Sequence, residues 1–264
     1  MKKLVCTGSV CIDDYRKMNG GQRYAGGGPL NSAVYCADEK VAVSLISAIG
    51  NDHDVYFTSQ LDRYKIDHSR LRIREGKTAV SEVQIKEGER VFTAYDEGVL
   101  KDFLLNDEDI AFMKDADLVL TDYWGKQEKL FPRLKAEGID LVLDGADHHK
   151  ELLPYCPYLQ ILFFSAGDLP DPGSIMKEYF EAGTKLVIAT MGERGALAYD
   201  GDYHFVQAVE CTDIKDSMGC GDAFIGTFLK HYLLGGDLEY CLYQANRKAS
   251  EVLTFYGAFR QRGF

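Results

Sequence analysis

Short apolar runs of strand length alternate with amphipathic segments of helical spacing between residues 118 and 190. In chain order these candidate elements are Leu118–Leu120, Gln127–Glu137, Ile139–Leu143, Gln160–Phe164, Gly173–Ala182 and Lys185–Ala189. Apolar strands separated by helices are typical of a parallel sheet whose crossover helices cover both faces. The sequence therefore predicts an α/β fold built on a doubly wound, mostly parallel sheet.

The N-terminal part adds elements of both kinds and one pair of strands that breaks the alternation. Leu4–Val10 and Val41–Ile49 are predicted strands, and His53–Tyr64 is a predicted helix. Thr78–Ile85 and Arg90–Tyr95 follow the two-residue period of a β-hairpin. Such a hairpin fits either an ordinary sheet edge or a small separate cover over the main sheet.

Charge and cysteine content narrow the class of protein. The 264 residues include 30 basic and 41 acidic side chains, a formal net charge of −11, which argues against nucleic acid or an anionic membrane as partner. The seven scattered cysteines are typical of reduced intracellular thiols. No segment approaches the roughly 20 apolar residues of a membrane span, so a soluble, cytoplasmic protein is expected.

The stretch Asp216–Phe224 carries the strongest chemical signal, at the start of a predicted helix that runs to residue 234. Its glycines let the main-chain N–H groups of Gly219, Cys220 and Gly221 approach a ligand at a helix N-terminus, where anions bind. Asp222 adds a carboxylate beside that anion site. Phosphoryl transfer to a hydroxyl needs both an anion site and a base, although this spacing also fits a helix start that binds nothing.

This stretch resembles the D-T-x-G-A-G-D-x-F signature of the PfkB/ribokinase family of carbohydrate kinases. The matching positions are Asp216, Gly219, Gly221, Asp222 and Phe224, whereas Ser217 and Cys220 depart from it with small side chains. The resemblance implies a ribokinase-like fold, ATP and Mg²⁺ as cofactors, and a sugar as acceptor. Asp222 would be the base, and the N–H groups of Gly219, Cys220 and Gly221 would stabilise the transferring phosphoryl group.

Two segments resemble the sugar-binding elements of this family. Gly8, Ser9 and Asp13 fit its G-S-x-x-x-D pattern, which makes Asp13 a candidate ligand of sugar hydroxyls, although Asp13 on residue type alone also fits a turn. The matches to its G-G-x-x-x-N-x-A element are Gly26, Gly27 and Asn31, which implies contacts of these residues with the sugar.

One position in the second segment departs from ribokinase itself. Ribokinase has a lysine where Gly28 stands, which makes ribose a less suitable acceptor. Three consecutive glycines before a helix also fit a merely flexible turn.

The nucleotide side rests on three further matches. Thr190, Gly192 and Gly195 fit a T-x-G-x-x-G element whose main chain contacts the nucleotide in the family. Asp216 in the signature and Asn246, by its place in a helix predicted over Leu238–Phe255, complete the expected ATP-binding residues.

The usual N-x-x-E element of the family, which helps to hold hydrated Mg²⁺, is altered. The segment Ser165–Asp168 keeps neither of its two conserved residues, so Asp168 is the candidate to replace the glutamate. The resemblance leaves open a monovalent cation as well.

Two stretches look like the fructosamine-kinase branch of the family, namely Tyr95–Phe103 and the Tyr123-Trp124-Gly125 tripeptide. The acceptor that this implies is the C6 hydroxyl of fructoselysine, with Glu97 and Tyr123 as substrate-binding candidates. Carboxylates and aromatics suit a sugar with an ammonium-bearing tail. The same residues also fit a solvated turn and a core aromatic. Asp144, at the end of a predicted strand, lies where the family has its substrate pocket.

The family also implies a division of the chain. Residues 1–264 would form one ribokinase-like domain, with a β lid from the inserted segments at about 14–25 and 78–98. A lid excludes water and so prevents wasteful hydrolysis of ATP. Because lid strands often pair between subunits in the family, a homodimer through the lid stays open.

Two alternatives to a fructoselysine kinase remain at this level. One is a kinase of the same family for fructose, a 2-keto-3-deoxy sugar acid or a nucleoside. The other is a regulatory protein that binds nucleotides and has lost the chemistry. The altered N-x-x-E element favours the second alternative, and the retained Asp222 argues against it more strongly.

Overall fold

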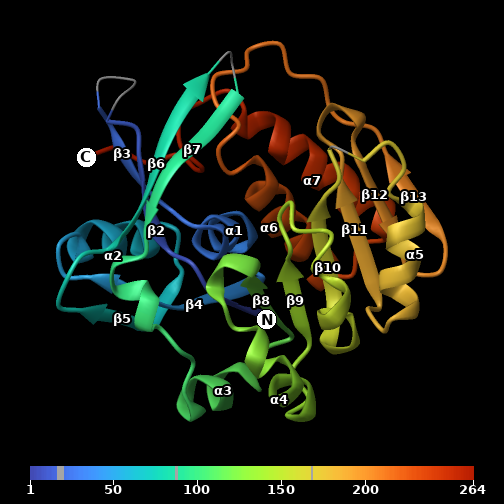
Figure 1. The fold of residues 1–264 in the computed structure, drawn as a ribbon, viewed down its shortest axis with the longest axis horizontal. Helices are drawn as coiled ribbons and strands as arrows, with labels where there is room; N and C mark the ends of the chain where they lie inside the picture. The colour runs from blue at the N-terminus through green and yellow to red at the C-terminus, as the bar shows by residue number, and fades with distance from the viewer. Residues whose placement is uncertain (17–20, 87–88, 168) are drawn as a thin grey trace.

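The computed structural model describes residues 1–16, 21–86, 89–167 and 169–264. In this part of the chain a nine-stranded sheet has the order β13-β12-β11-β10-β9-β8-β1-β4-β5 (Figure 1). Its strands are β1 (Lys2–Thr7), β4 (Val41–Gly50), β5 (Asp67–Arg74), β8 (Leu118–Asp122), β9 (Leu141–Asp144), β10 (Leu159–Ser165), β11 (Leu186–Thr190), β12 (Ala196–Tyr199) and β13 (Tyr203–Val206). Neighbouring strands from β11 across to β5 pair in parallel, and β12 pairs antiparallel with both β11 and β13.

Helices cover both faces of this sheet. One face packs against α1 (Gly28–Cys36), α2 (Asp54–Arg63), α6 (Cys220–Leu233) and α7 (Leu238–Val252). The other packs against α3 (Asp107–Met113), α4 (Phe131–Ala136) and α5 (Gly173–Glu181). In β10, Ile161 and Phe163 belong to the first core and Leu162 and Phe164 to the second, as the alternation of a strand buried on both faces requires. The predicted doubly wound fold is confirmed.

The order of the strands places a switch point beside β1. From β1 the chain continues to β4 and β5 on one side, and the strands that follow from β8 onward extend the sheet on the other side. In open α/β sheets, ligands bind outside the carboxyl ends of the strands at such a point. The ends of β1 and β8 are therefore the first place to look for a site.

A second, four-stranded sheet has the order β3-β2-β6-β7 among the described residues. Its strands are β2 (Cys11–Asp14), β3 (Arg23–Gly26), β6 (Ala79–Lys86) and β7 (Glu89–Asp96). It stands off the main sheet, on the side to which β8, β9 and β10 point (Figure 1). Both segments expected to build a lid contribute strands to it, and residues 17–20 and 87–88 of those segments lie outside the described residues.

Short 3-10 turns connect several of these elements. They are η1 (Gly98–Asp102), η2 (Tyr123–Gly125), η3 (Glu128–Leu130), η4 (Leu153–Tyr158) and η5 (Gly192–Arg194). The helix predicted over Gln127–Glu137 divides into η3 and α4, with a proline in the first turn of α4, a position that proline favours. β5 was missed because charged side chains occupy half of its positions (DHSRLRIR).

The first predicted strand also ends earlier than expected. The chain leaves β1 after Thr7, turns at Gly8, whose φ is +133°, and starts again as β2. Asp13 consequently lies inside a strand of the second sheet, and the interpretation of Asp13 as a turn residue is wrong. Nowhere in the described ranges does a helix have the length and apolar character needed to cross a membrane.

Candidate active site

The turn at Gly8 brings the end of β1 against the end of β8. The Ser9 N–H donates to Asp122 Oδ1 at 3.1 Å, and the Ser9 hydroxyl donates to Asp122 Oδ2. A Cβ on Gly8 would lie 2.0 Å from Asp122 Oδ1, so only glycine leaves room for this carboxylate. Asp122 is thereby fixed at the switch point with its side chain buried.

Three carboxylates converge on Gly28, the first residue of α1. A Cβ placed on Gly28 would lie 3.4 Å from Asp222 Oδ1, 3.6 Å from Asp144 Oδ2 and 3.8 Å from Asp122 Oδ2. Asp122 ends β8, Asp144 ends β9, and Asp222 lies in the first turn of α6. Residues separated by up to 100 positions therefore form one acidic site, which we call the carboxylate site (Asp122, Asp144 and Asp222).

Burial and mutual repulsion raise two of these pKa values. Desolvation, with a smaller contribution from the charge of Asp222, raises the pKa of Asp122 to about 6, although the hydrogen bonds from Ser9 act in the opposite direction. Desolvation, followed by the charge of Asp222, raises the pKa of Asp144 to about 7. Within the described residues neither Asp122 nor Asp144 has an ion-pair partner. The carboxylate site thus suits a cationic group of a ligand, or hydroxyls that contact protonated carboxyls.

Packing between α1 and α6 positions the predicted base. Asn31 Nδ2 donates to Asp222 Oδ2 at 2.7 Å, and the Ser32 hydroxyl donates to the Asp222 carbonyl oxygen at 3.2 Å. The two helices can approach closely because residue 226 is glycine; a Cβ at this position would lie only 2.2 Å from the Ser32 carbonyl oxygen. The sequence-predicted pair of Asn31 and Asp222 is therefore brought together, with Asn31 only 2% exposed.

The glycine pair before α1 has a steric reason. A Cβ on Gly26 would lie 2.0 Å from Asp13 Oδ2, and a Cβ on Gly27, whose φ is +103°, would lie 2.3 Å from the Ser9 carbonyl oxygen. Asp13 and Gly26 lie on the paired strands β2 and β3, near the carboxylate site. Their contact with a sugar stays a prediction, but the interpretation as a merely flexible turn is wrong.

The anion site at the start of α6 is built by two glycines with different surroundings. Gly219 has φ +74°, and a Cβ there would lie 2.4 Å from Ala258 Cβ. A Cβ on Gly221 would meet no atom within 4 Å, so this residue faces open space. The Cys220 N–H donates to the Ser217 carbonyl oxygen at 3.3 Å. One of the three predicted donors is therefore already engaged within this loop.

Asp216, a predicted ATP-binding residue, is held by hydrogen bonds within the protein. Its carboxylate is 1% exposed and accepts hydrogen bonds from the Met218 N–H at 2.9 Å, from the Gly257 N–H at 3.0 Å and from the Tyr15 hydroxyl. Both oxygens are thus occupied within the protein. Asp216 positions the loop before α6, and its contact with ATP stays a prediction.

The other predicted ATP-binding residues gather at the end of β11. Thr190 ends that strand, and Gly192 and Gly195, with φ +57° and +95°, flank η5. A Cβ on Gly192 would meet nothing within 4 Å, whereas one on Gly195 would lie 2.2 Å from the Val206 carbonyl oxygen. Gly192 is thus the open position of this loop.

Asn246 reaches the same edge of the sheet from α7, where Nδ2 donates to the Val206 carbonyl oxygen at 3.4 Å. Asn246 is 7% exposed, so α7 holds it against β13. Nucleotide contacts by Asn246 and by the η5 loop stay predictions.

No metal centre emerges from the described residues. They contain no group of three or more His, Cys, Asp or Glu side chains that could hold a metal ion. Asp168, the predicted Mg²⁺ residue, lies outside the described residues. Mg²⁺ keeps several waters and is often bound through substrate phosphates, so a nucleotide-bound ion requires no such group.

Beyond the carboxylate site, aromatic residues follow Asp122. The Tyr123 ring stacks on His148, with centroids 3.9 Å apart, and Trp124 packs edge-on against the same imidazole at 4.9 Å. Trp124 is 55% exposed. Glu97, the other predicted substrate residue, forms an ion pair with Lys126. Its charge is therefore already balanced within the protein.

Sequence reasoning gave no role to Asp122 and did not foresee Gly28 as the point of convergence. A carboxylate at the end of a predicted strand was the signal for Asp122, the same signal that had drawn attention to Asp144. The order of strands in the sheet decides which strand ends lie side by side, and this order cannot be read from the sequence.

Comparison with known proteins agrees with this geometry. A family model described as pfkB family carbohydrate kinase matches residues 1–156 and 159–260. The chain belongs to the pfkB family of carbohydrate kinases. It is 33% identical over 263 residues to the fructoselysine 6-kinase of Escherichia coli (strain K12), covering 98% of this chain and 100% of that protein. This pfkB kinase is accordingly an ATP-dependent sugar kinase.

Two further proteins resemble this pfkB kinase along almost its whole length. The fructosamine kinase FrlD of Bacillus subtilis (strain 168) is 29% identical over 266 residues, which cover 97% of this chain and 93% of that protein. A structure of Arabidopsis thaliana ribokinase, complexed with ribose and ATP, superposes with a TM-score of 0.81 at 18% identity, covering 97% of this chain and 94% of that one. The second match supports the ribokinase-like fold.

Proposed function

We propose that this pfkB kinase transfers the γ-phosphoryl group of ATP to the C6 hydroxyl of a fructosamine, with fructoselysine as the substrate. The observation that carries the proposal is the carboxylate site, in which Asp122 and Asp144 lie beside the predicted base Asp222. Asp122 and Asp144 form no ion pair with any described residue. A fructosamine brings a secondary ammonium on the carbon next to its sugar ring. The similarity to a fructoselysine 6-kinase supports the same acceptor.

In this mechanism Asp222 accepts the proton of the attacking hydroxyl. Asn31 holds its carboxylate through the 2.7 Å hydrogen bond and leaves the other oxygen, Oδ1, toward Gly28. General-base assistance of this kind contributes about 10²–10⁴-fold. Because Gly28 has no side chain, α1 adds no bulk in front of Oδ1, which is where the acceptor hydroxyl would bind.

Charge that develops on the transferring group meets the start of α6. The first N–H groups of a helix have no intrahelical acceptor, and the space beside the Gly221 Cα is open to a ligand. By analogy with oxyanion holes, each well-placed donor contributes about 10²–10³-fold. ATP would bind between this helix start and the η5 loop, and its Mg²⁺ would neutralise phosphate charge.

Asp122 and Asp144 would bind the ammonium of the substrate. A cation close to both carboxylates favours their ionised forms and reverses the rise in pKa that burial and repulsion cause. A neutral ketose offers no such compensation. A sugar acid would add a fourth carboxylate to the site, which argues against that class of acceptor.

The second sheet would act as a lid. It carries Asp13 toward the site on β2 and extends beyond it with β6 and β7. Closing such a cover over the acceptor excludes water, which would otherwise compete with the sugar for the phosphoryl group.

A coupled assay of ADP release tests the proposed acceptor. The panel contains fructoselysine, fructose, ribose, 2-keto-3-deoxygluconate and adenosine, each with ATP and Mg²⁺. We expect kcat/KM for fructoselysine to exceed that for fructose by at least tenfold, the factor that corresponds to about 1.4 kcal/mol. A higher value for any other acceptor overturns the proposal, and ATP binding without turnover of any acceptor indicates a kinase that has lost its chemistry.

A further inference from the structure

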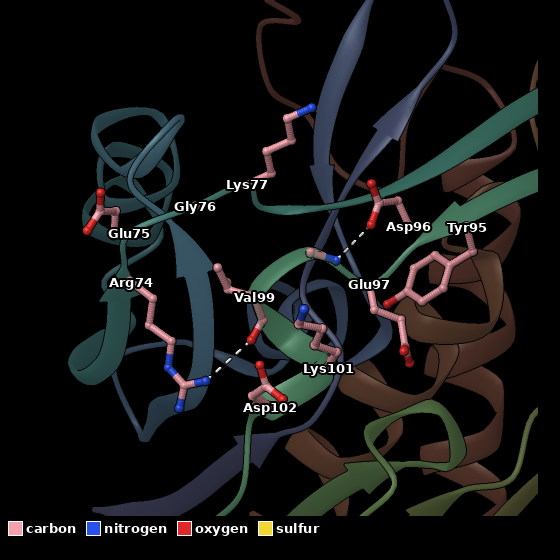
Figure 2. A pocket seen from close by; sticks show the side chains of 11 residues that line it. Arg74, Glu75, Gly76, Lys77, Tyr95, Asp96, Glu97, Val99, Lys101 and Asp102 are labelled. Carbon is pink, nitrogen blue, oxygen red and sulfur yellow. Dashed lines mark hydrogen bonds between the residues drawn. The ribbon is translucent and has the colours of Figure 1, made fainter.

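A cavity of about 730 Å³ opens between the segment that follows β5 and the turn that follows β7. Residues 74–77, 95–99, 101 and 102 line it, and Figure 2 shows their side chains. Its volume is in the range of small-molecule sites, about 300–1,000 Å³. None of the predicted catalytic residues lines this cavity.

The lining carries charges of both signs, in the pattern that a zwitterion would match. The basic side chains are Arg74, Lys77 and Lys101, and the acidic ones are Glu75, Asp96, Glu97 and Asp102. Two of these charges are already engaged, because Arg74 donates to the Val99 carbonyl oxygen at 3.3 Å and Glu97 pairs with Lys126. Among the described residues, Lys77, Lys101 and Asp102 form no ion pair. Both signs are thus left to meet a ligand.

Tyr95 connects this cavity with the carboxylate site. In the second sheet, Tyr95 on β7 pairs with Ser81 on β6, and Ser81 pairs with Asp13 on β2. Residues paired directly across strands project from the same face of a sheet, so Tyr95 and Asp13 share a face. Tyr95 is 47% exposed; partial desolvation of its phenol raises its pKa, and the nearby acidic groups of Cys11, Asp122, Glu97 and Asp13 raise it further.

The groups that raise the pKa of Tyr95 come from both regions. Glu97 lines the cavity, whereas Asp122 and Asp13 belong to the region around Gly28. The Tyr95 ring lies on the cavity side beside Glu97 (Figure 2). A ligand in the carboxylate site would therefore have to extend along Tyr95 to contact the charged cavity.

We propose that this cavity binds the α-amino acid group at the far end of the fructosamine tail, an assignment that rests on the proposed function. Lys77 and Lys101 receive the α-carboxylate, Asp96 and Asp102 receive the α-ammonium, and Tyr95 lies along the alkyl chain between the two charged ends. The occupant is thus a zwitterion at the end of an unbranched aliphatic linker. Any fructosamine with a neutral tail lacks these contacts.

Substrate analogues test the assignment with the wild-type protein. The series contains fructoselysine, its Nα-acetyl derivative, its carboxamide, and the fructosamine of n-butylamine, which keeps the sugar and the secondary ammonium. Charge-assisted hydrogen bonds are the stronger class, so we expect KM to rise roughly 10- to 100-fold for the butylamine compound. We expect kcat to stay within about threefold, because the reacting hydroxyl is unchanged.

Two variants then assign the carboxylate contact. Lys101→Met and Lys77→Met keep the aliphatic stem and remove the charge, and Lys135→Met on α4 is the matched control on the far side of the sheet. We expect the cavity variants to reduce the preference for fructoselysine over its carboxamide, while KM for the butylamine compound stays at its wild-type value. The Lys135 control should retain the full preference.

The outcomes separate this inference from the proposed function. Equal KM values for fructoselysine and the butylamine compound overturn the cavity assignment and leave a fructosamine kinase in place. A preference that survives in both lysine variants also overturns it. Turnover of fructose with no turnover of either fructosamine overturns the proposed function, and the cavity assignment with it.

Discussion

Asn31 Nδ2 lies 2.7 Å from Asp222 Oδ2 and donates a hydrogen bond that links the N-terminal part of α1 to the first turn of α6. These residues are 191 positions apart, and their packing leaves Asp222 Oδ1 facing the bare Cα of Gly28. The base is therefore oriented by one helix and presented at the start of another. Four expectations follow from this arrangement and its surroundings.

Asp222→Asn should lower kcat by about 10²–10⁴-fold, because the amide cannot accept the hydroxyl proton. Affinity for ATP should change little, since the nucleotide would contact the main chain at the start of α6. Steady-state kinetics and calorimetric ATP titration measure the two effects separately. Asn31→Ala, which removes the orienting donor, is the companion variant and should have a smaller effect on kcat. Near-full turnover by Asp222→Asn would remove Asp222 from the mechanism.

Gly221→Ala and Gly219→Ala should act by different routes. A Cβ on Gly221 meets no atom within 4 Å, so this variant should fold normally but place a methyl group in the anion site and lower kcat. A Cβ on Gly219 would lie 2.4 Å from Ala258 Cβ at a φ of +74°, which should destabilise the protein by about 1–3 kcal/mol. Thermal unfolding and steady-state kinetics of both variants check this contrast. Equal stability losses would contradict it.

Gly28→Lys should place an ammonium of the protein in the carboxylate site, where it would balance the negative charge that a cationic substrate otherwise meets. The Cβ of the new lysine would lie 3.4–3.8 Å from carboxylate oxygens of Asp222, Asp144 and Asp122. Its flexible side chain could therefore bring the ammonium to all three carboxylates. We expect at least a tenfold higher KM for fructoselysine, because the substrate ammonium would meet a site that is already compensated.

Gly28→Met is the matched control for that variant, since it fills a similar volume without charge. If both variants raise KM for fructoselysine and for fructose alike, bulk explains the result and the charge argument fails. A loss specific to Gly28→Lys and to the fructosamine supports it.

The raised pKa values of Asp122 and Asp144, about 6 and about 7, predict how pH affects stability. An acid with a higher pKa in the folded state binds its proton more tightly there, so its stabilising contribution is complete below the unfolded value of about 4 and is lost as pH rises toward 7. The ligand-free protein should therefore lose stability over this interval from these two groups.

A bound fructosamine should compensate that loss, because its ammonium favours the ionised carboxylates. The increase in Tm caused by fructoselysine should grow from pH 5.5 to pH 7.5, as differential scanning fluorimetry can measure. Asp144→Asn should flatten this dependence, and fructose should produce none of it. A ligand-induced shift that is the same at both pH values contradicts a cation-binding role.

Much of this protein follows from its sequence. The alternation of apolar runs and helical segments determined the doubly wound sheet, because strands buried on both faces need side chains of that kind on both sides. The nine-residue stretch Asp216–Phe224 determined where the base and the anion site would lie, since glycines before a helix and an acid in its first turn act locally. These features depend on near neighbours in the chain.

Only the tertiary structure decided what gathers around that base. Asp122 and Asp144 reach Asp222 because β8 lies between β1 and β9 and because α6 packs against α1. No local sequence pattern records this strand order or this helix contact. The tertiary structure also shows that the Asp216 carboxylate accepts hydrogen bonds within the fold, and that the missing side chains of Gly26 and Gly27 leave room for Asp13 and Ser9. The sequence specifies each carboxylate separately. A concentrated negative charge forms only when long-range packing places the three carboxylates together, away from water.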